Sequence, residues 1–385
     1  MSVNLLIKPV SSACNMRCEY CFYADVSKHR KVANYGMMST QTLETAVRAA
    51  FKHAKRGGAC NFAFQGGEPT LAGLDFYKEL IELQKKYNIE KIPVANSIQT
   101  NGYNIDGEWA DFFAEHKFLV GLSLDGKREI HDLFRRDSSG AGTWDKVLEA
   151  ASVFTKKRVE FNILCVVNNI VAKKGISVYN SLKSRGFRYI QFIPCLAPFG
   201  DDDRNRDETL SKPGFNPEPK NFGEFLKSTF DLYYNDLKNS NYVSVRNFDN
   251  YISILLGANP ECCGMNGFCS LNFVVESDGS VYPCDFYVLD KYRLGNISTH
   301  SFEELAKTET ARKFISQSYY IDDECKKCRW YKLCRGGCFR EREPVSSDGK
   351  PSLNVYCKQY KEFFDHSFNK MQTAAEIVRN TQKNL

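Results

Sequence analysis

Short apolar runs alternate with longer amphipathic stretches over the first half of the chain, and this alternation constrains the fold more than any other feature. Runs rich in apolar or β-branched residues predict six strands, at residues 4–8, 61–64, 94–98, 118–123, 161–167 and 189–193. Helical periodicity between them predicts helices at residues 40–56, 74–87, 109–116, 143–156 and 175–184. Repeats of this kind form a parallel sheet, either open or closed as an incomplete barrel.

The rest of the chain has a different pattern. Residues 198–221 are a predicted linker, because they contain three consecutive aspartates and several prolines and glycines and are too polar to pack a core of their own. We therefore expect one domain over residues 1–197 and a smaller one over residues 222–385. In the smaller domain we expect helices at residues 222–237, 245–256 and from 360 past 371, and a hairpin that joins residues 273–276 to 281–282.

Composition limits the classes of protein that remain. The net charge of +6 is spread over 385 residues without a basic run, which argues against a nucleic-acid partner. We find no cleavable leader and no apolar run of about 18 residues, so we expect a cytosolic protein without a membrane partner. Thiols are kept reduced in the cytosol. Fifteen cysteines, many of them closely spaced, therefore indicate metal binding or catalysis rather than disulfides.

The first cysteine group is Cys14-x3-Cys18-x2-Cys21, directly after the first predicted strand. These cysteines would therefore lie at the carboxyl end of that strand, which is the edge of the sheet where the active sites of βα folds lie. Three thiolates can hold three corners of a [4Fe–4S] cluster, which leaves one iron open to a small molecule. A zinc site lacking a ligand and three unrelated core cysteines are the alternatives.

The second cysteine group lies in the C-terminal part of the chain. It consists of eight residues, enough for two fully ligated [4Fe–4S] clusters: Cys263, Cys269, Cys284, Cys325, Cys328, Cys334, Cys338 and Cys357. Structural zinc is the alternative, because Cys-x2-Cys pairs are common in zinc ribbons. Cys262 could replace its neighbour Cys263 as a ligand. Cys60, Cys165 and Cys195 fall on or beside strands, and we expect them to be small buried apolar residues.

The first cysteine group, followed by Phe22-Tyr23 and by Gln65-Gly66-Gly67-Glu68-Pro69, resembles the radical S-adenosylmethionine (SAM) superfamily. The resemblance implies an incomplete (β/α)6 barrel of the radical SAM type, with a smaller C-terminal domain that binds two auxiliary clusters. It implies that the open iron chelates the methionine moiety of SAM and that Glu68 receives its amino group. Gly66 and Gly67 would let the backbone approach this ligand closely. Further SAM contacts implied by the resemblance are Tyr20, Gly67, Ser123, Arg135 and Leu196, although each residue could instead be structural.

The second cysteine group resembles the two-cluster extension of peptide-modifying radical enzymes. This resemblance implies two sets of ligands. Those of the first auxiliary cluster are Cys263, Cys269, Cys284 and Cys338, and those of the second are Cys325, Cys328, Cys334 and Cys357.

Residues 62–73, 99–102 and 280–290 are similar to anaerobic sulfatase-maturating enzymes. Those enzymes oxidise a cysteine, and in some members a serine, of a sulfatase peptide to Cα-formylglycine. The resemblance implies SAM and three [4Fe–4S] clusters as cofactors, a sulfatase polypeptide as substrate, and a low-potential electron donor such as flavodoxin or ferredoxin. It also implies that Asp285 is the proton acceptor, whereas the alternative is an aspartate that caps a loop. Gln65 is a candidate peptide contact.

Two other functions compete with this interpretation. Thioether-forming or epimerising radical enzymes share every cluster motif, but they commonly carry an N-terminal peptide-recognition domain, for which there is no room before Cys14. A zinc-ribbon binding or scaffold protein would have no need of Gly66-Gly67-Glu68.

Overall fold

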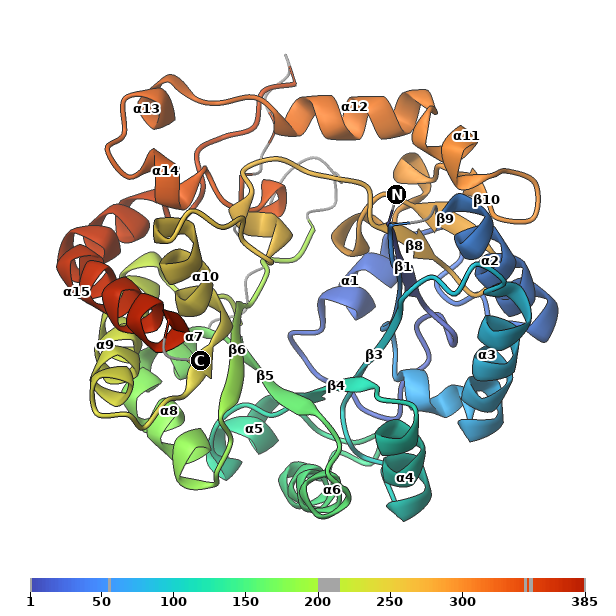
Figure 1. Ribbon diagram of the computed structural model, residues 1–385, viewed down its shortest axis with the longest axis horizontal. Helices are drawn as coiled ribbons and strands as arrows, with labels where there is room; N and C mark the ends of the chain where they lie inside the picture. The colour runs from blue at the N-terminus through green and yellow to red at the C-terminus, as the bar shows by residue number, and fades with distance from the viewer. Residues whose placement is uncertain (1, 55–56, 200–214, 343–344, 346–348, 384–385) are drawn as a thin grey trace. The chain divides into compact units, whose positions relative to one another are not determined.

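The computed structural model describes residues 2–54, 57–199, 215–342, 345 and 349–383. These residues form two compact units, which Figure 1 shows coloured along the chain. The first unit comprises residues 1–123, 135–161 and 270–315, and the second comprises residues 124–134, 162–269 and 316–385. Most of the predicted linker at 198–221, and the last two residues of the helix predicted at 40–56, lie outside the described residues. The domain boundaries at 197 and 222 stay a prediction.

The sheet of the first unit is built on four parallel strands in chain order. They are β1 (Val3–Ile7), β2 (Cys60–Phe64), β3 (Val94–Thr100) and β4 (Leu119–Ser123). The predictions at residues 4–8, 61–64, 94–98 and 118–123 are confirmed to within two residues. Alternate residues of β1 and β2 are buried, as expected for strands whose side chains point to opposite faces.

A C-terminal hairpin extends this same sheet. β8 (Phe273–Val275) and β9 (Ser280–Tyr282) pair antiparallel, which confirms the predicted hairpin, and β10 (Gly295–Asn296) follows β9. β8 also pairs parallel with β1, with Leu5 opposite Phe273 and Ile7 opposite Val275. The C-terminal part of the chain is therefore continuous with the N-terminal sheet, which the sequence did not predict.

Helices cover the strands of the first unit. They are α1 (Phe22–Lys28), α2 (Thr40–His53), α3 (Leu74–Tyr87), α4 (Gly107–Glu115), α6 (Trp144–Lys157) and α11 (Phe302–Ala306), while α12 (Glu309–Ser318) begins in this unit. Tyr77 of α3 is fully buried, with its ring 5.2 Å from that of Phe64 and 5.5 Å from that of Trp109. Its hydroxyl donates to the carbonyl of Pro69 at 2.9 Å. The core thus fixes the turn that follows β2.

A buried charged network joins the N-terminal loop of this unit to the hairpin. Glu276, fully buried after β8, accepts hydrogen bonds from Tyr23 (2.5 Å) and Ser11 (2.7 Å) and pairs with Arg30 at 3.5 Å. A buried carboxylate is tolerated only when hydrogen bonds and an opposite charge compensate it. These contacts therefore hold α1 against the end of β8.

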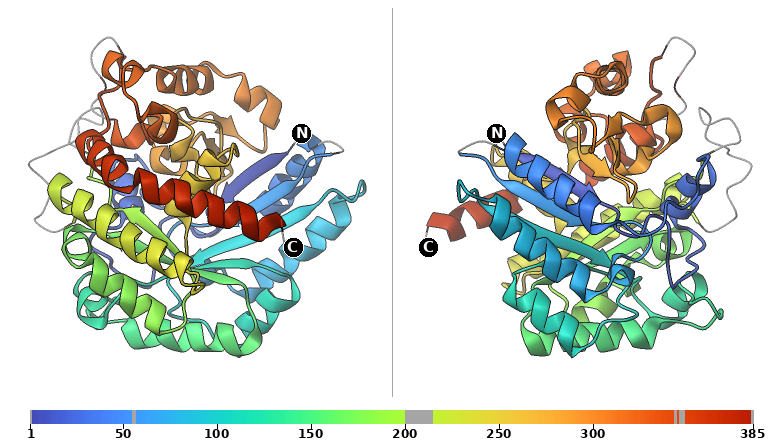
Figure 2. Two further views of the ribbon diagram at one scale, coloured as in Figure 1. Left: turned by 60° about the vertical axis from the view of Figure 1, so that its left-hand side comes forward. Right: turned by 90° about the vertical axis from the view of Figure 1, so that its right-hand side faces the viewer.

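The second unit contains the parallel strands β5 (Phe161–Val167), β6 (Tyr189–Pro194) and β7 (Ser244–Val245), in that order. The last two of the six predicted strands are thereby confirmed. Its helices are α5 (Arg128–Phe134), α7 (Asn169–Lys173), α8 (Gly175–Ser184), α9 (Pro219–Lys238), α10 (Arg246–Leu255), α13 (Asp323–Lys326), α14 (Tyr331–Cys334) and α15 (Cys357–Lys383). Helices α9 and α15 lie side by side (Figure 2), with the rings of Phe222 and Tyr360 6.0 Å apart. Among the described helices, none has the length and apolar character needed to cross a membrane.

Candidate active site

The first cysteine group occupies the loop between β1 and α1, and neighbouring segments hold this loop by its backbone. The amide of Arg17 donates to the carbonyl of Arg136 at 2.7 Å, and the carbonyl of Ala13 accepts from the amide of Glu68 at 2.8 Å. Cys14, Cys18 and Cys21 are all partly exposed. The loop therefore presents three thiols at the carboxyl end of the first strand, as predicted.

Two N–H groups point at the sulfur of Cys14. The amide of Met16 lies 3.4 Å from Sγ, and Nδ2 of Asn101 lies 3.8 Å from it. Burial raises the pKa of the Cys14 thiol to about 11. A thiolate ligand at this position therefore depends on nearby positive charge and N–H donors, which suits a metal cluster. Asn101, directly after β3, was missed by sequence reasoning.

The turn after β2 packs directly on the cysteine loop. Gly67 has φ +54°, and a Cβ atom built on it would lie 2.0 Å from the carbonyl oxygen of Ala13. Gly66 has φ +109°, and a Cβ there would lie 2.9 Å from Cγ of Lys8. Both positions therefore require glycine for close backbone approach within the protein, in addition to any approach to a ligand.

Glu68 is buried and already holds several donors. Its Oε1 accepts from the amide and hydroxyl of Thr70 (3.1 and 2.7 Å) and from the hydroxyl of Thr100 (2.8 Å), and its Oε2 accepts from the amide of Asn101 (2.7 Å). Burial raises the pKa of Glu68, and these hydrogen bonds act in the opposite direction. The carboxylate thus ties the end of β2 to the end of β3. Its predicted contact with an amino group would use the remaining lone-pair capacity of Oε2, which accepts only one hydrogen bond within the protein.

The other residues predicted to contact SAM fall into both units. In the first unit, the guanidinium of buried Arg135 lies over the ring of Tyr20, 5.4 Å from its centroid. Ser123 is buried at the end of β4. In the second unit, Leu196 is half-buried just after β6. The structure therefore brings Tyr20 and Arg135 together, and all of these contacts with SAM stay predictions.

Asp285 lies directly after Cys284 and is held by two donors from strand ends. Its Oδ1 pairs with Nζ of Lys8 at 2.5 Å, and its Oδ2 accepts from Nε2 of Gln65 at 2.9 Å. The Asp285 side chain is 13% exposed and that of Lys8 is 0% exposed. Gln65, predicted as a peptide contact, thus orients the predicted base.

Lys8 was not predicted as a functional residue. Its Nζ lies 3.7 Å from the centroid of the Tyr23 ring as well as beside Asp285. A lysine at the end of a buried strand needs a counter-charge, and this is the sequence signal that could have identified it. The first unit therefore contains a carboxylate, Asp285, that two hydrogen-bond donors hold in place beside the predicted cluster ligand Cys284.

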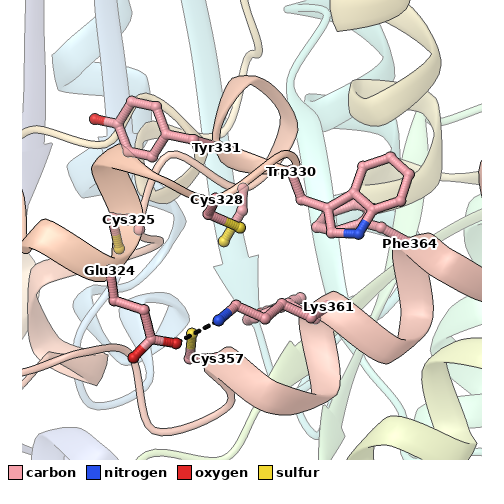
Figure 3. A pocket seen from close by; sticks show the side chains of 11 residues that line it. Glu324, Cys325, Cys328, Trp330, Tyr331, Cys357, Lys361 and Phe364 are labelled. Atoms are coloured by element: carbon pink, nitrogen blue, oxygen red, sulfur yellow. Dashed lines mark hydrogen bonds and ion pairs between the residues drawn. The ribbon is translucent and has the colours of Figure 1, made fainter.

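The predicted ligands of the second auxiliary cluster all lie in the second unit and line one cavity, drawn in Figure 3. These thiols are Cys325, Cys328, Cys334 and Cys357. Trp330 and Phe364 also line the cavity, where Lys361 forms an ion pair with Glu324. Four thiols on one largely apolar cavity match the donor set of a four-cysteine cluster.

A structural zinc ion would need its thiol ligands grouped closely. Zinc holds its sulfur ligands only about 2.3 Å from the metal. Within the described ranges, no three His, Cys, Asp or Glu side chains form a group that could hold one metal ion.

Three of the four predicted ligands of the first auxiliary cluster lie in the second unit. A Cβ built on Gly264, next to Cys263, would lie 3.3 Å from Cβ of Cys338. Burial raises the pKa of the Cys269 thiol to about 11, and negative charge on Cys263 contributes to this rise. The fourth predicted ligand, Cys284, belongs to the first unit. Cys60, Cys165 and Cys195 are buried, which confirms the expectation for them.

Two protein-family models match separate parts of the chain. A model described as the radical SAM superfamily matches residues 9–177, and one described as an iron–sulfur cluster-binding domain (SPASM) matches residues 263–329. The chain is a radical SAM enzyme with a C-terminal iron–sulfur domain. The predicted fold class is confirmed.

Full-length relatives define the family more closely. A cysteine-type anaerobic sulfatase-maturating enzyme of Clostridium perfringens is 48% identical over 98% of this chain and 99% of its own length. A serine-type enzyme of Bacteroides thetaiotaomicron is 32% identical over 98% of this chain and 92% of its own length. A solved structure of native anSMEcpe with bound AdoMet and a Cp18Cys peptide has a TM-score of 0.91 and 47% identity, and covers 98% of this chain and 100% of that chain. The chain belongs to the anaerobic sulfatase-maturating enzymes.

Replacing Gly67 should disturb the cysteine loop. We expect Gly67→Ala to lower the iron bound after anaerobic reconstitution, because the added methyl group would collide with the backbone of Ala13. Gly73→Ala is the matched control, since Gly73 also has positive φ (+82°) but nothing lies within 4 Å of its Cβ position. Equal iron content and equal visible absorbance in the two variants would contradict this account.

Removing Cys357 should remove one cluster. We expect Cys357→Ala to bind about four fewer iron atoms per chain than the unsubstituted protein, since each [4Fe–4S] cluster contains four irons. Cys60→Ala, which changes a buried strand cysteine, should bind the full amount. If metal analysis shows that Cys357→Ala has lost zinc rather than iron, the zinc interpretation is supported.

Proposed function

We propose that this enzyme oxidises a cysteine side chain of a sulfatase polypeptide to Cα-formylglycine. The observation that carries the proposal is the clamped carboxylate of Asp285, held by Lys8 and Gln65 next to the predicted cluster ligand Cys284. Family membership supports the reaction type. Cysteine rather than serine is proposed because the cysteine-type relatives are 46–48% identical, whereas the serine-type relatives are 31–32% identical.

The cofactors and the protein divide the work. When bound, a [4Fe–4S] cluster and SAM supply a 5′-deoxyadenosyl radical that takes a hydrogen atom from the substrate Cβ. The residues Cys14, Cys18 and Cys21 would hold that cluster. The protein's own task is to place the peptide and to accept the thiol proton. The cysteine side chain loses two hydrogens in total: the radical takes one as a hydrogen atom, and the other leaves as a proton that Asp285 would accept and an electron that an auxiliary cluster would accept. Water then hydrolyses the resulting thioaldehyde to the aldehyde and hydrogen sulfide.

Asp285 is the group placed to accept the thiol proton. Each of its oxygens receives one hydrogen bond from the protein, from Lys8 and from Gln65 respectively. A carboxylate has about four lone-pair sites, so both oxygens keep capacity for a further donor. Because the two donors fix the carboxylate, an approaching thiol would meet it in a set orientation.

The remaining partners follow from the chemistry and from the sequence. A low-potential electron donor such as flavodoxin or ferredoxin would start each cycle. We propose the cytosol as the compartment, because closely spaced free thiols need reducing conditions. Sulfatase peptides with the target cysteine are the proposed substrates.

Replacing Asp285 should separate radical formation from peptide oxidation. With SAM, a strong reductant and a cysteine-containing sulfatase-motif peptide, we expect Asp285→Asn to form 5′-deoxyadenosine but to lose formylglycine by at least about 100-fold, the usual contribution of a general base. The measurement is peptide mass together with the amount of 5′-deoxyadenosine.

Asp290→Asn is the control for this experiment. Asp290 is an exposed aspartate in the same segment, and it accepts from the amide of Lys31 at 2.8 Å. This variant should remain active. If the unsubstituted enzyme instead forms a thioether or an epimerised residue, the chain is one of the other two-cluster peptide-modifying enzymes. If Asp285→Asn keeps full activity, Asp285 is not the base.

A further inference from the structure

A buried arginine lies beside predicted ligands of both auxiliary clusters. Arg342, immediately after the short helix at Phe339–Glu341, is 5% exposed. Its guanidinium donates to the carbonyl oxygen of Ser318 at 3.2 Å and to that of Tyr320. Both acceptors are neutral, and within the part of the chain that the structure describes no carboxylate forms an ion pair with Arg342. Among the described residues, its charge therefore has no carboxylate counter-ion.

Contacts within the second unit connect this guanidinium to one predicted ligand of each auxiliary cluster. Ser318, which accepts from Arg342 through its carbonyl, also accepts from the amide of Cys269 through its hydroxyl at 2.8 Å. On the other side, Arg342 and Cys325 line the same cavity. Cys269 is a predicted ligand of the first auxiliary cluster and Cys325 of the second, so one cation adjoins both.

The neighbouring cations are placed differently. Lys361 also lines the cavity of the second cluster site, but Glu324 pairs with it there. Arg335 lines the cavity that Arg342 and Cys325 share, but it is only half-buried and donates to the carbonyl of Lys332. In the cavity that both line, Arg342 is thus more deeply buried than Arg335.

Burying a guanidinium costs free energy unless an anion compensates it. Clusters with four thiolate ligands carry net negative charge, which increases by one unit on one-electron reduction. A nearby positive charge in a poorly solvated region stabilises the more negative, reduced form and so raises the reduction potential.

We propose that Arg342 is the shared counter-charge of the two auxiliary cluster sites and raises the reduction potential of both clusters. The inference rests on the proposed function, in which the second electron from the substrate has to be accepted within the protein. With a higher potential, each auxiliary cluster accepts one electron more readily.

The test is a redox titration of the reconstituted full-length protein, followed by electron paramagnetic resonance and carried out without peptide. We expect Arg342→Gln and Arg342→Met to shift both auxiliary potentials to more negative values, while Arg342→Lys, which keeps the charge, stays close to the unsubstituted protein. Arg340→Gln is the matched control. Arg340 is also buried, but its guanidinium donates to the carbonyl of Ala197 and lies over the ring of Phe199.

Each outcome decides the proposal. If both neutral variants lose auxiliary clusters while Arg342→Lys retains them, charge compensation is also supported. The proposal would be overturned if the neutral variants kept the potentials of the unsubstituted protein. It would also be overturned if Arg342→Lys or Arg340→Gln shifted the potentials as much as the neutral variants do. Because the titration contains no peptide, its result is independent of whether the unsubstituted enzyme makes formylglycine, which the peptide assay measures separately.

Discussion

The contact between the cysteine loop and the Gly66-Gly67-Glu68 turn is the constraint on which the rest of the first unit's site depends. The amide of Glu68 donates to the carbonyl of Ala13, one residue before Cys14, and Gly67 leaves room for that approach. The carboxylate of Glu68 then holds the amide of Asn101, whose side chain reaches the sulfur of Cys14. Three strand ends are thus locked together around one thiol, so the cysteine loop is positioned by the sheet rather than by its own sequence alone.

The same sheet also positions the predicted base. Because β8 pairs with β1, the segment after β9 returns to the end of the first strand, where Asp285 meets Lys8 from 277 positions earlier in the sequence. Glu276 reinforces this arrangement through Tyr23, Ser11 and Arg30. The C-terminal hairpin is therefore a structural part of the N-terminal unit, and the predicted base Asp285, which lies after this hairpin, is held by Lys8 and Gln65 from the first two strand ends.

The sequence predicted the local structure well, and it predicted the tertiary contacts poorly. Strands and helices were placed to within a few residues because hydrophobic periodicity is a local property. The cysteine groups were recognisable because their spacing is also local. Lys8, Asn101 and Arg342 were missed, since their roles depend on contacts with residues far away in the sequence. For Lys8 the available signal was a cation at the end of a predicted strand, whereas the burial of Arg342 could be judged only from the folded chain.

The most direct test of the account follows a hydrogen atom. A sulfatase-motif peptide whose target cysteine carries deuterium at Cβ would be incubated anaerobically with the reconstituted enzyme, SAM and a reductant, and the 5′-deoxyadenosine would be analysed by mass spectrometry. The account predicts one deuterium in the 5′-deoxyadenosine for each formylglycine formed, because the radical removes a hydrogen from that carbon. Unlabelled 5′-deoxyadenosine accompanied by a change elsewhere in the peptide would contradict it.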